Sequence, residues 1–237
     1  MNLISLQIKT SENFGENLDY LKELILQCED NSIILAPELA LTGFCYERME
    51  EASHFALNAI EEIKQLSINK TIALTFVIKK DEKFFNTLYM FNNQETIHTQ
   101  SKVQLFPLGN ELEHFQAGDI EDIKIIEING LKIATLICFE LRFPKLWQKV
   151  LGADVILNPA MWGLKRKDHY ETISKSLALI NQCFVIACNS ADENMAKGSG
   201  IISPFGNVYR NDDKEILSQE VDLEEIKKVR KYINIGI

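Results

Sequence analysis

The chain lacks an apolar run long enough to span a bilayer. Its amino terminus, MNLISLQIKT, has neither the basic segment nor the long apolar segment of a signal peptide. It also lacks low-complexity segments, internal repeats and linkers. These absences predict a cytoplasmic protein without a membrane partner. They also favour one domain over residues 1–237, because α/β folds commonly reach this length undivided.

Positive charge is in short supply. The chain has 25 Lys and Arg against 34 Asp and Glu, which gives a formal net charge of -9. Nucleic acids and anionic membranes attract basic surfaces, so neither is expected as a partner. The acidic residues are spread along the chain, which is typical of a solubilising surface rather than of a binding site.

Paired cysteines are missing as well. The five cysteines are odd in number and include no CxxC pair: Cys28, Cys45, Cys138, Cys183 and Cys188. We therefore expect free thiols in a reducing compartment and neither disulfides nor a structural zinc site. No metal or organic cofactor is predicted.

Strand and helix patterns alternate along a chain that is 46% hydrophobic. Apolar, β-prone runs predict strands at Leu3–Ile8, Ile33–Ala36, Thr71–Ile78, Thr87–Phe91, Ile123–Ile128, Lys132–Cys138, Val155–Leu157, Phe184–Cys188 and Gly200–Ser203. Amphipathic patterns predict helices at Glu16–Cys28, Glu50–Leu66, Phe143–Leu151, Asp168–Gln182 and Asp222–Lys231. Two hairpins are also expected, one with the tip KKDEK and one turning at Asn129-Gly130. Such a mixture favours one or two mixed sheets buried by helices.

Cys138 ends a buried strand in the run LKIATLICFELRFP, just before two charged residues and a proline. Free cysteines are often ordinary core residues. A thiol at the end of a strand that runs into a charged turn is also where an α/β enzyme holds its nucleophile. The choice between the two interpretations depends on whether other catalytic residue types occur in matching positions.

Glu38 stands at the end of a second apolar strand, in the block APELALTGF. It follows Pro37 and is flanked by Leu39, Ala40 and Leu41. A poorly solvated carboxylate of this kind suits a general base. The alternative is a glutamate at a helix N-terminus, where the helix dipole stabilises it.

Lys102 precedes the turn LFPLGNELEHFQAG. Most lysines are solvated surface groups, and Lys102 alone would be interpreted in that way. It becomes a candidate catalytic residue only in combination with Glu38 and Cys138. A fixed ammonium near a thiol favours the thiolate and can hold a developing oxyanion.

In this order and spacing, the blocks APELALTGF, SKVQLFP and ICFELRFP resemble the nitrilase superfamily of carbon–nitrogen hydrolases, whose members use a Glu-Lys-Cys triad. Supporting blocks are FFNTLYMF, LNPAMW, ALINQCFVIACN and GSGIISPFGNV. Within the superfamily the chain is most similar to the amidase branch near the ω-amidases. The resemblance implies a four-layer αββα sandwich with two mixed β-sheets, and a homodimer or larger homo-oligomer.

The resemblance also implies the chemistry. Glu38 would act as the base, Cys138 as the nucleophile and Lys102 as the oxyanion-binding group, with a thioester intermediate and release of ammonia from a small amide. It implies a second glutamate, placed at Glu111, with Glu113 as the rival.

Three further residues are candidates for binding the substrate. The backbone N–H of Phe139 would help to hold the oxyanion. Arg142 could pair with a substrate carboxylate or tie its turn to a neighbouring acid. Trp162 would wall the pocket or only pack. The chain differs from many relatives in having Gln104 in place of His, and Phe139-Glu140 in place of Tyr-Asp.

Other functions stay open on the sequence alone. The same triad would serve an N-carbamoyl amidase, a nitrilase or an acyl transfer to an amine. A Cys-His hydrolase would need one of the four histidines, of which only His114 lies in a motif. A nitrilase-like fold kept for protein binding is the non-enzymatic alternative.

Overall fold

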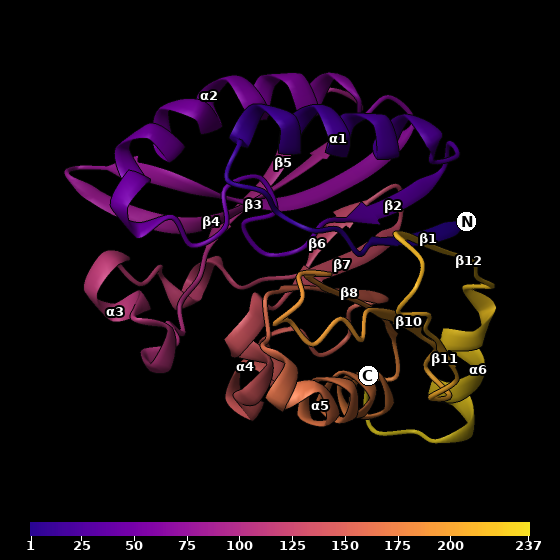
Figure 1. The fold of residues 1–237 in the computed structure, drawn as a ribbon. Coiled ribbons are helices and arrows are strands. Elements are labelled where there is room, and N and C mark those ends of the chain that lie inside the picture. Colours follow the sequence, from indigo (N-terminus) through magenta and orange to yellow (C-terminus); the bar gives the residue numbers. More distant parts are fainter.

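The computed structural model describes residues 1–237 and has four layers: helices, a sheet, a second sheet and helices again (Figure 1). Each sheet has six strands and mixes parallel with antiparallel neighbours. The predicted αββα sandwich is therefore confirmed. No helix combines the length and the apolar character that crossing a membrane would require.

The first sheet carries the amino-terminal half of the chain and has the order β12-β1-β2-β3-β4-β5. Its strands are β1 (Asn2–Leu6), β2 (Ser32–Leu35), β3 (Lys70–Lys80), β4 (Lys83–Asn92), β5 (Glu95–Ser101) and β12 (Ile216–Glu220). Helices α1 (Phe14–Gln27) and α2 (Met49–Gln65) cover its outer face (Figure 1).

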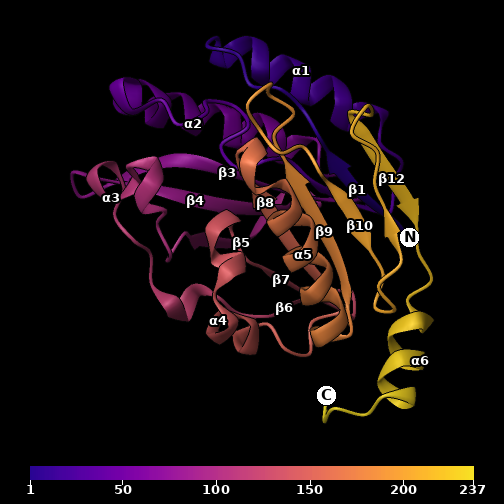
Figure 2. The same ribbon diagram turned by 60° about the horizontal axis from the view of Figure 1, so that its bottom comes forward.

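The second sheet has the order β11-β10-β9-β8-β7-β6. Its strands are β6 (Ile126–Ile128), β7 (Leu131–Thr135), β8 (Val155–Ala160), β9 (Phe184–Asn189), β10 (Gly200–Ile202) and β11 (Val208–Tyr209). Helices α4 (Pro144–Lys149) and α5 (Lys167–Asn181) cover its outer face. The short α3 (Glu111–His114) and α6 (Glu224–Tyr232) lie at opposite ends of the molecule (Figure 1, Figure 2).

Local sequence signals account for several boundaries. The Asn13 side chain caps α1 by accepting hydrogen bonds from the backbone N–H groups of Gly15 and Glu16. The Asn129-Gly130 turn has φ values of 52° and 81°, the positive values that a tight hairpin needs, and it joins β6 to β7. The KKDEK tip likewise joins β3 to β4. Both predicted hairpins are confirmed.

Two predicted strand boundaries were wrong. β7 ends at Thr135 instead of Cys138. The Glu140 carboxylate accepts a hydrogen bond from the backbone N–H of Ile137, so this N–H is not available to pair with the neighbouring strand. β6 begins at Ile126 instead of Ile123, because the Ile123 N–H bonds to Ile120 within a 3-10 turn.

The sequence pattern also misplaced one helical residue and missed three strands. The helical periodicity of the predicted Asp168–Gln182 helix puts Ile180 on the same apolar stripe as Tyr170, Ile173 and Leu177, but Ile180 is 55% exposed. Strand β11, which is only two residues long, was not predicted. Strands β5 and β12 were not predicted either, because their sequences ETIHTQS and ILSQE are largely polar. Both strands lie at the edges of the first sheet, where one side of a strand needs no partner and polar residues are tolerated.

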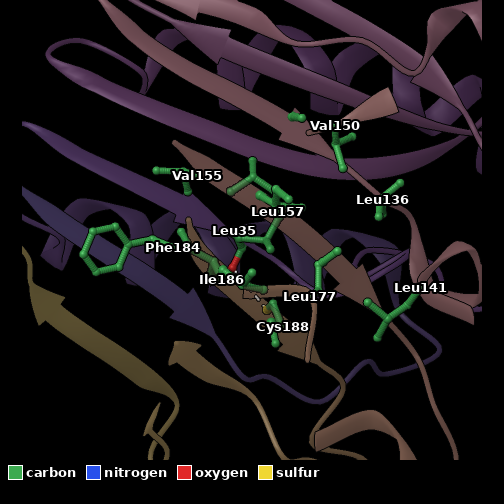
Figure 3. Close-up of a cluster of buried hydrophobic side chains, with 14 of the residues drawn as sticks. Leu35, Leu136, Leu141, Val150, Val155, Leu157, Leu177, Phe184, Ile186 and Cys188 are labelled. Carbon is green, nitrogen blue, oxygen red and sulfur yellow. Dashed lines mark hydrogen bonds between the residues drawn. The ribbon is translucent and has the colours of Figure 1, made fainter. Parts of the chain in front are cut away.

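The largest core cluster draws on both sheets (Figure 3). Leu35 from the first sheet packs in the same cluster as Leu157 and Cys188 from the second. The Cys188 thiol lies 3.2 Å from the backbone oxygen of Leu35 and 3.3 Å from that of Leu6. The interface between the sheets is thus largely apolar, and the strand ends that emerge from it have fixed relative positions.

Leu157→Ala is expected to lower the free energy of unfolding by about 2–5 kcal/mol, because Leu157 is fully buried and a cavity would remain. The matched control is Leu26→Ala on α1, where the side chain is 65% exposed and the change should stay within about 0.5 kcal/mol. Urea unfolding of both variants checks this, and equal effects would contradict it.

Candidate active site

Four of the predicted residues converge at one edge of the sandwich. Glu38 lies three residues beyond β2, Lys102 directly follows β5, and Cys138 lies three residues beyond β7. The Lys102 Nζ atom is 2.7 Å from Glu38 Oε1 and 2.8 Å from Glu111 Oε1. All four side chains are buried. A lysine held between two carboxylates beside a thiol is an arrangement that packing alone does not require.

Glu38 is fixed by its neighbours. Leu39, next in sequence, has φ of 47°, and its N–H donates to the Thr75 hydroxyl at 2.6 Å. The Glu38 N–H donates to the Ala160 carbonyl at 3.3 Å, which ties the end of β2 to the end of β8. Glu38 Oε1 accepts from Lys102 and from Asn86 Nδ2 at 2.8 Å, whereas Oε2 has no hydrogen-bond partner in the protein. One oxygen therefore anchors the carboxylate and the other can receive a proton.

Lys102 is completely buried. Burial alone lowers the pKa of a lysine, but the neighbouring acidic groups, Glu38 first and Glu111 with it, outweigh burial and leave its pKa above the usual range. The side chain is therefore a permanent cation. The alternative of a solvated surface lysine is wrong for this residue.

Cys138 opens a 3-10 turn, Cys138–Arg142, with φ of 49°. Positive φ in a residue other than glycine is unfavourable by about 1–3 kcal/mol and is concentrated at functional sites. Burial and the adjacent Glu38 carboxylate raise the pKa of the thiol well above its usual range, and Lys102 opposes them. The resting group is thus a thiol, which needs a base before it can attack.

Glu111, not Glu113, contacts Lys102. Glu111 begins α3 directly after Asn110, which has φ of 57°, and its side chain is buried, whereas Glu113 is exposed. Burial raises the pKa of Glu111, with the charge of Lys102 acting in the opposite direction. Its Oε2 atom has no partner in the protein. Glu111 can therefore accept a hydrogen bond from a molecule that enters the site.

A cavity of about 250 Å³ opens onto Glu38, Glu111 and Cys138. None of the four histidines contributes to it. His114, the histidine expected for a Cys-His enzyme, stacks on Tyr46 with ring centroids 4.0 Å apart. The cavity is lined by Glu38, Phe44, Tyr46, Phe106, Leu108, Gly109, Glu111, Cys138, Phe139, Arg142, Met161, Trp162, Gly163, Arg166 and Met195.

The three residues considered for substrate binding all line this cavity. The Phe139 ring packs on Phe106 at a centroid distance of 5.0 Å. The Arg142 guanidinium lies 4.5 Å from the ring centre of Trp162, which is 3% exposed. Its Nη2 atom is 2.9 Å from the His169 ring. Arg142 is therefore held in place by an aromatic face and an imidazole ring rather than by an acid.

Sequence reasoning missed Arg166, which lies over the Phe106 ring at 5.1 Å. Burial and the charge of Arg166 lower the pKa of Arg142, so the two guanidinium groups repel each other across the pocket. The ion pairs that arginines form in this protein belong to Arg48, Arg210 and Arg230 instead. The sequence did contain a signal for Arg166. The basic run GLKRK directly follows β8, and the end of β8 contacts Glu38.

Other residues that line the cavity could not have been predicted from a sequence motif. Tyr46 and Met195 lie in segments without a motif, and only the fold brings them to the cavity. No group of three or more His, Cys, Asp or Glu side chains is arranged to hold a metal ion.

The sequence profile of the carbon–nitrogen hydrolases matches residues 3–231. The chain belongs to this family. The resemblance to the nitrilase superfamily is thus confirmed, as is the expectation of an enzyme that acts on carbon–nitrogen bonds other than peptide bonds.

Curated relatives of this carbon–nitrogen hydrolase include 2-oxoglutaramate amidase of Bacillus subtilis, 30% identical over 240 residues that cover 96% of this chain and 91% of the relative. Omega-amidase YafV of Escherichia coli is 28% identical over 190 residues, covering 76% and 72% of the two chains. Among solved structures, XC1258 of Xanthomonas campestris has a TM-score of 0.85 at 21% identity, covering 98% of this chain and 94% of that one. Saccharomyces cerevisiae Nit3 has a TM-score of 0.82 at 20% identity, covering 100% and 95%. The two structures show the fold.

Proposed function

We propose that this carbon–nitrogen hydrolase is an ω-amidase-like enzyme. It hydrolyses the terminal amide of a small carboxylate-bearing molecule through a thioester on Cys138 and releases ammonia. The observation that carries the proposal is the buried Lys102 ammonium, held by two carboxylates that line a small cavity together with the Cys138 thiol. The names of the relatives from B. subtilis and E. coli agree with this activity.

In the first half of the reaction, Glu38 removes the proton from the Cys138 thiol through its free Oε2 atom. The thiolate attacks the amide carbon and forms the S–C bond, and the carbonyl oxygen becomes an oxyanion. Lys102 and the backbone N–H of Phe139 hold that oxyanion. Collapse of the tetrahedral intermediate breaks the C–N bond, and the nitrogen takes the proton from Glu38 and leaves as ammonia.

In the second half, water replaces ammonia in the site. Glu38 removes a proton from this water, and the oxygen attacks the thioester carbon. The C–S bond breaks, the sulfur takes back the proton, and the carboxylic acid product leaves. Glu111 positions Lys102 and accepts a hydrogen bond from the substrate amide through its free oxygen. The net reaction converts the amide and water into a carboxylate and ammonium.

The substrate's own carboxylate binds to the arginines that line the pocket. Arg142 and Arg166 are two cations without acidic partners in a protein of net charge -9. A planar guanidinium binds a carboxylate through two parallel hydrogen bonds. The ion pairs formed in this way would fix the distance from the carboxylate to the amide that reacts.

Arg142→Met is expected to lower kcat/KM for a carboxylate-bearing ω-amide about ten- to a hundred-fold, since a charged hydrogen bond contributes about 1.5–3 kcal/mol. The effect on a neutral aliphatic amide should be within about three-fold. Arg142→Lys, which keeps the charge without the planar fork, serves as the matched variant and should lie between the two. Equal losses on the charged and the neutral amide would contradict a role in binding the carboxylate.

Ammonia release tests the proposed function. The wild-type enzyme and Cys138→Ser are compared on ω-amides of dicarboxylic and 2-oxo dicarboxylic acids, N-carbamoyl compounds and nitriles. The proposal predicts turnover of the ω-amides by the wild type alone. Turnover confined to carbamoyl compounds or nitriles would replace the amidase assignment, and the absence of turnover throughout would favour a non-catalytic protein.

A further inference from the structure

Glu140 is a fully buried carboxylate that has no basic partner. Its Oε1 atom accepts a hydrogen bond from the backbone N–H of Val103 at 2.7 Å, and its Oε2 atom accepts one from the N–H of Ile137, also at 2.7 Å. Burial raises the pKa of Glu140 to about 7, and the backbone N–H groups act in the opposite direction. Burying an acid in this way is unfavourable, so a plain structural role would be filled at lower cost by a neutral side chain.

The two backbone groups have one feature in common. Val103 follows Lys102 directly, and Ile137 directly precedes Cys138. Lys102 leaves the first sheet at the end of β5, whereas Cys138 leaves the second sheet beyond β7. The Glu140 carboxylate therefore bridges the two sheets at the point where the ammonium and the thiol must meet.

A second contact runs beside this bridge. Gln100 Nε2, near the end of β5, donates to the backbone oxygen of Thr135 at 3.2 Å. That contact joins the two strands themselves, whereas the Glu140 bridge joins the residues adjacent to Lys102 and Cys138. Of these two contacts between the sheets, the carboxylate bridge is the one nearer to Lys102 and Cys138, whose positions decide the distance from ammonium to sulfur.

We propose that Glu140 is a positioning residue of the reaction: its carboxylate clamps the Lys102 and Cys138 segments together and so places the ammonium where the oxyanion forms. The proposal rests on the proposed function, in which Cys138 is the nucleophile and Lys102 holds the oxyanion. The clamp touches neither the substrate nor the reacting atoms. Its loss should therefore slow the chemical step and leave substrate binding unchanged.

Glu140→Gln is the decisive variant, because glutamine keeps the shape but can accept only one of the two N–H groups through its single side-chain oxygen. We expect kcat to fall about ten- to a hundred-fold, the effect of a displacement of about 1 Å between catalytic groups, with KM changed less than about three-fold. The rate at which iodoacetamide alkylates Cys138 should fall in parallel at the same pH. Glu140→Asp keeps the charge on a shorter side chain and should recover part of the lost rate.

Asp154→Asn provides the matched control. Asp154 accepts the N–H of Lys132 at 3.0 Å, at the other end of the same β7 segment and away from the cavity. This variant should lose stability in a thermal melt but keep the kcat and the alkylation rate of the wild type. A purely structural Glu140 would behave in the same way.

The outcomes are distinct. Wild-type kcat and alkylation rate in a folded Glu140→Gln protein would overturn the clamp. If that variant does not fold, Glu140→Asp decides, and wild-type kcat in Glu140→Asp would also overturn it. Cys138→Ser is measured alongside: turnover that survives in it would overturn the proposed function itself, whereas an inactive Cys138→Ser with an unaffected Glu140→Gln would remove only the clamp.

Discussion

Glu38→Gln is expected to lower kcat for ammonia release by about a thousand-fold, within the range that a positioned general base contributes. Glutamine keeps the size of the side chain and one oxygen for Lys102 and Asn86, so the fold should persist. What it lacks is the carboxylate oxygen that takes the proton from Cys138. Steady-state ammonia release, with a thermal melt to verify folding, measures the effect.

Glu113→Gln is the matched control for this substitution. Glu113 lies on α3 near Glu111 but is exposed and has no contact with Lys102. Its variant should keep the kcat of the wild type. A loss below about ten-fold in Glu38→Gln would contradict the assignment of the base and reopen the search for another proton acceptor.

Lys102→Met is expected to impair both stability and catalysis. Removing the ammonium leaves two buried carboxylates unpaired, which should lower the free energy of unfolding by about 3–5 kcal/mol. Loss of the oxyanion-binding charge should lower kcat by about a hundred- to a thousand-fold. Urea unfolding and ammonia release measure the two effects separately.

The pH dependence of this variant gives a further check. Burial raises the pKa of Glu111, and without the ammonium nothing opposes that shift. An acid whose pKa is raised in the folded state binds more protons there than in the unfolded state, so stability should increase as the pH falls from about 8 towards 6. Lys124→Met, at an exposed position, should change stability by no more than about 0.5 kcal/mol at either pH. Equal stability of Lys102→Met and Lys124→Met would contradict the buried network.

The sequence predicted the layers of the fold and the residues that meet at its edge. Glu38, Lys102 and Cys138 each stand at or just beyond the end of a strand, and strand ends that point the same way meet at one edge of a sandwich. Short motifs with strong local chemistry were therefore enough to place these groups. The roles that we assign to them in the reaction are part of the proposed function.

The remaining features of the site and of the strand boundaries depend on contacts between residues that are distant in sequence. Arg166 lines the cavity from the position just before α5, and Tyr46 lines it from the 3-10 turn just before α2. The end of β7 was misplaced because a side chain, Glu140, takes a backbone donor that periodicity assigns to the sheet. Ile180 is apolar and exposed, and helical periodicity does not distinguish such a position from the buried stripe.

The assembly of the protein stays a prediction. Apolar side chains near the carboxyl terminus are exposed, with Tyr232 at 82%, Ile233 at 52% and Ile235 at 49%. Sedimentation of the purified chain would show whether the predicted homodimer or larger assembly forms.

The central claim is that the substrate acylates Cys138. Mass spectrometry of enzyme quenched during turnover of an ω-amide tests it most directly, followed by mapping of the modified peptide. The account predicts an increase equal to the mass of the substrate minus ammonia on the peptide that contains Cys138, with no adduct and no ammonia in Cys138→Ala. Ammonia released by Cys138→Ala, or an adduct on another residue, would contradict it.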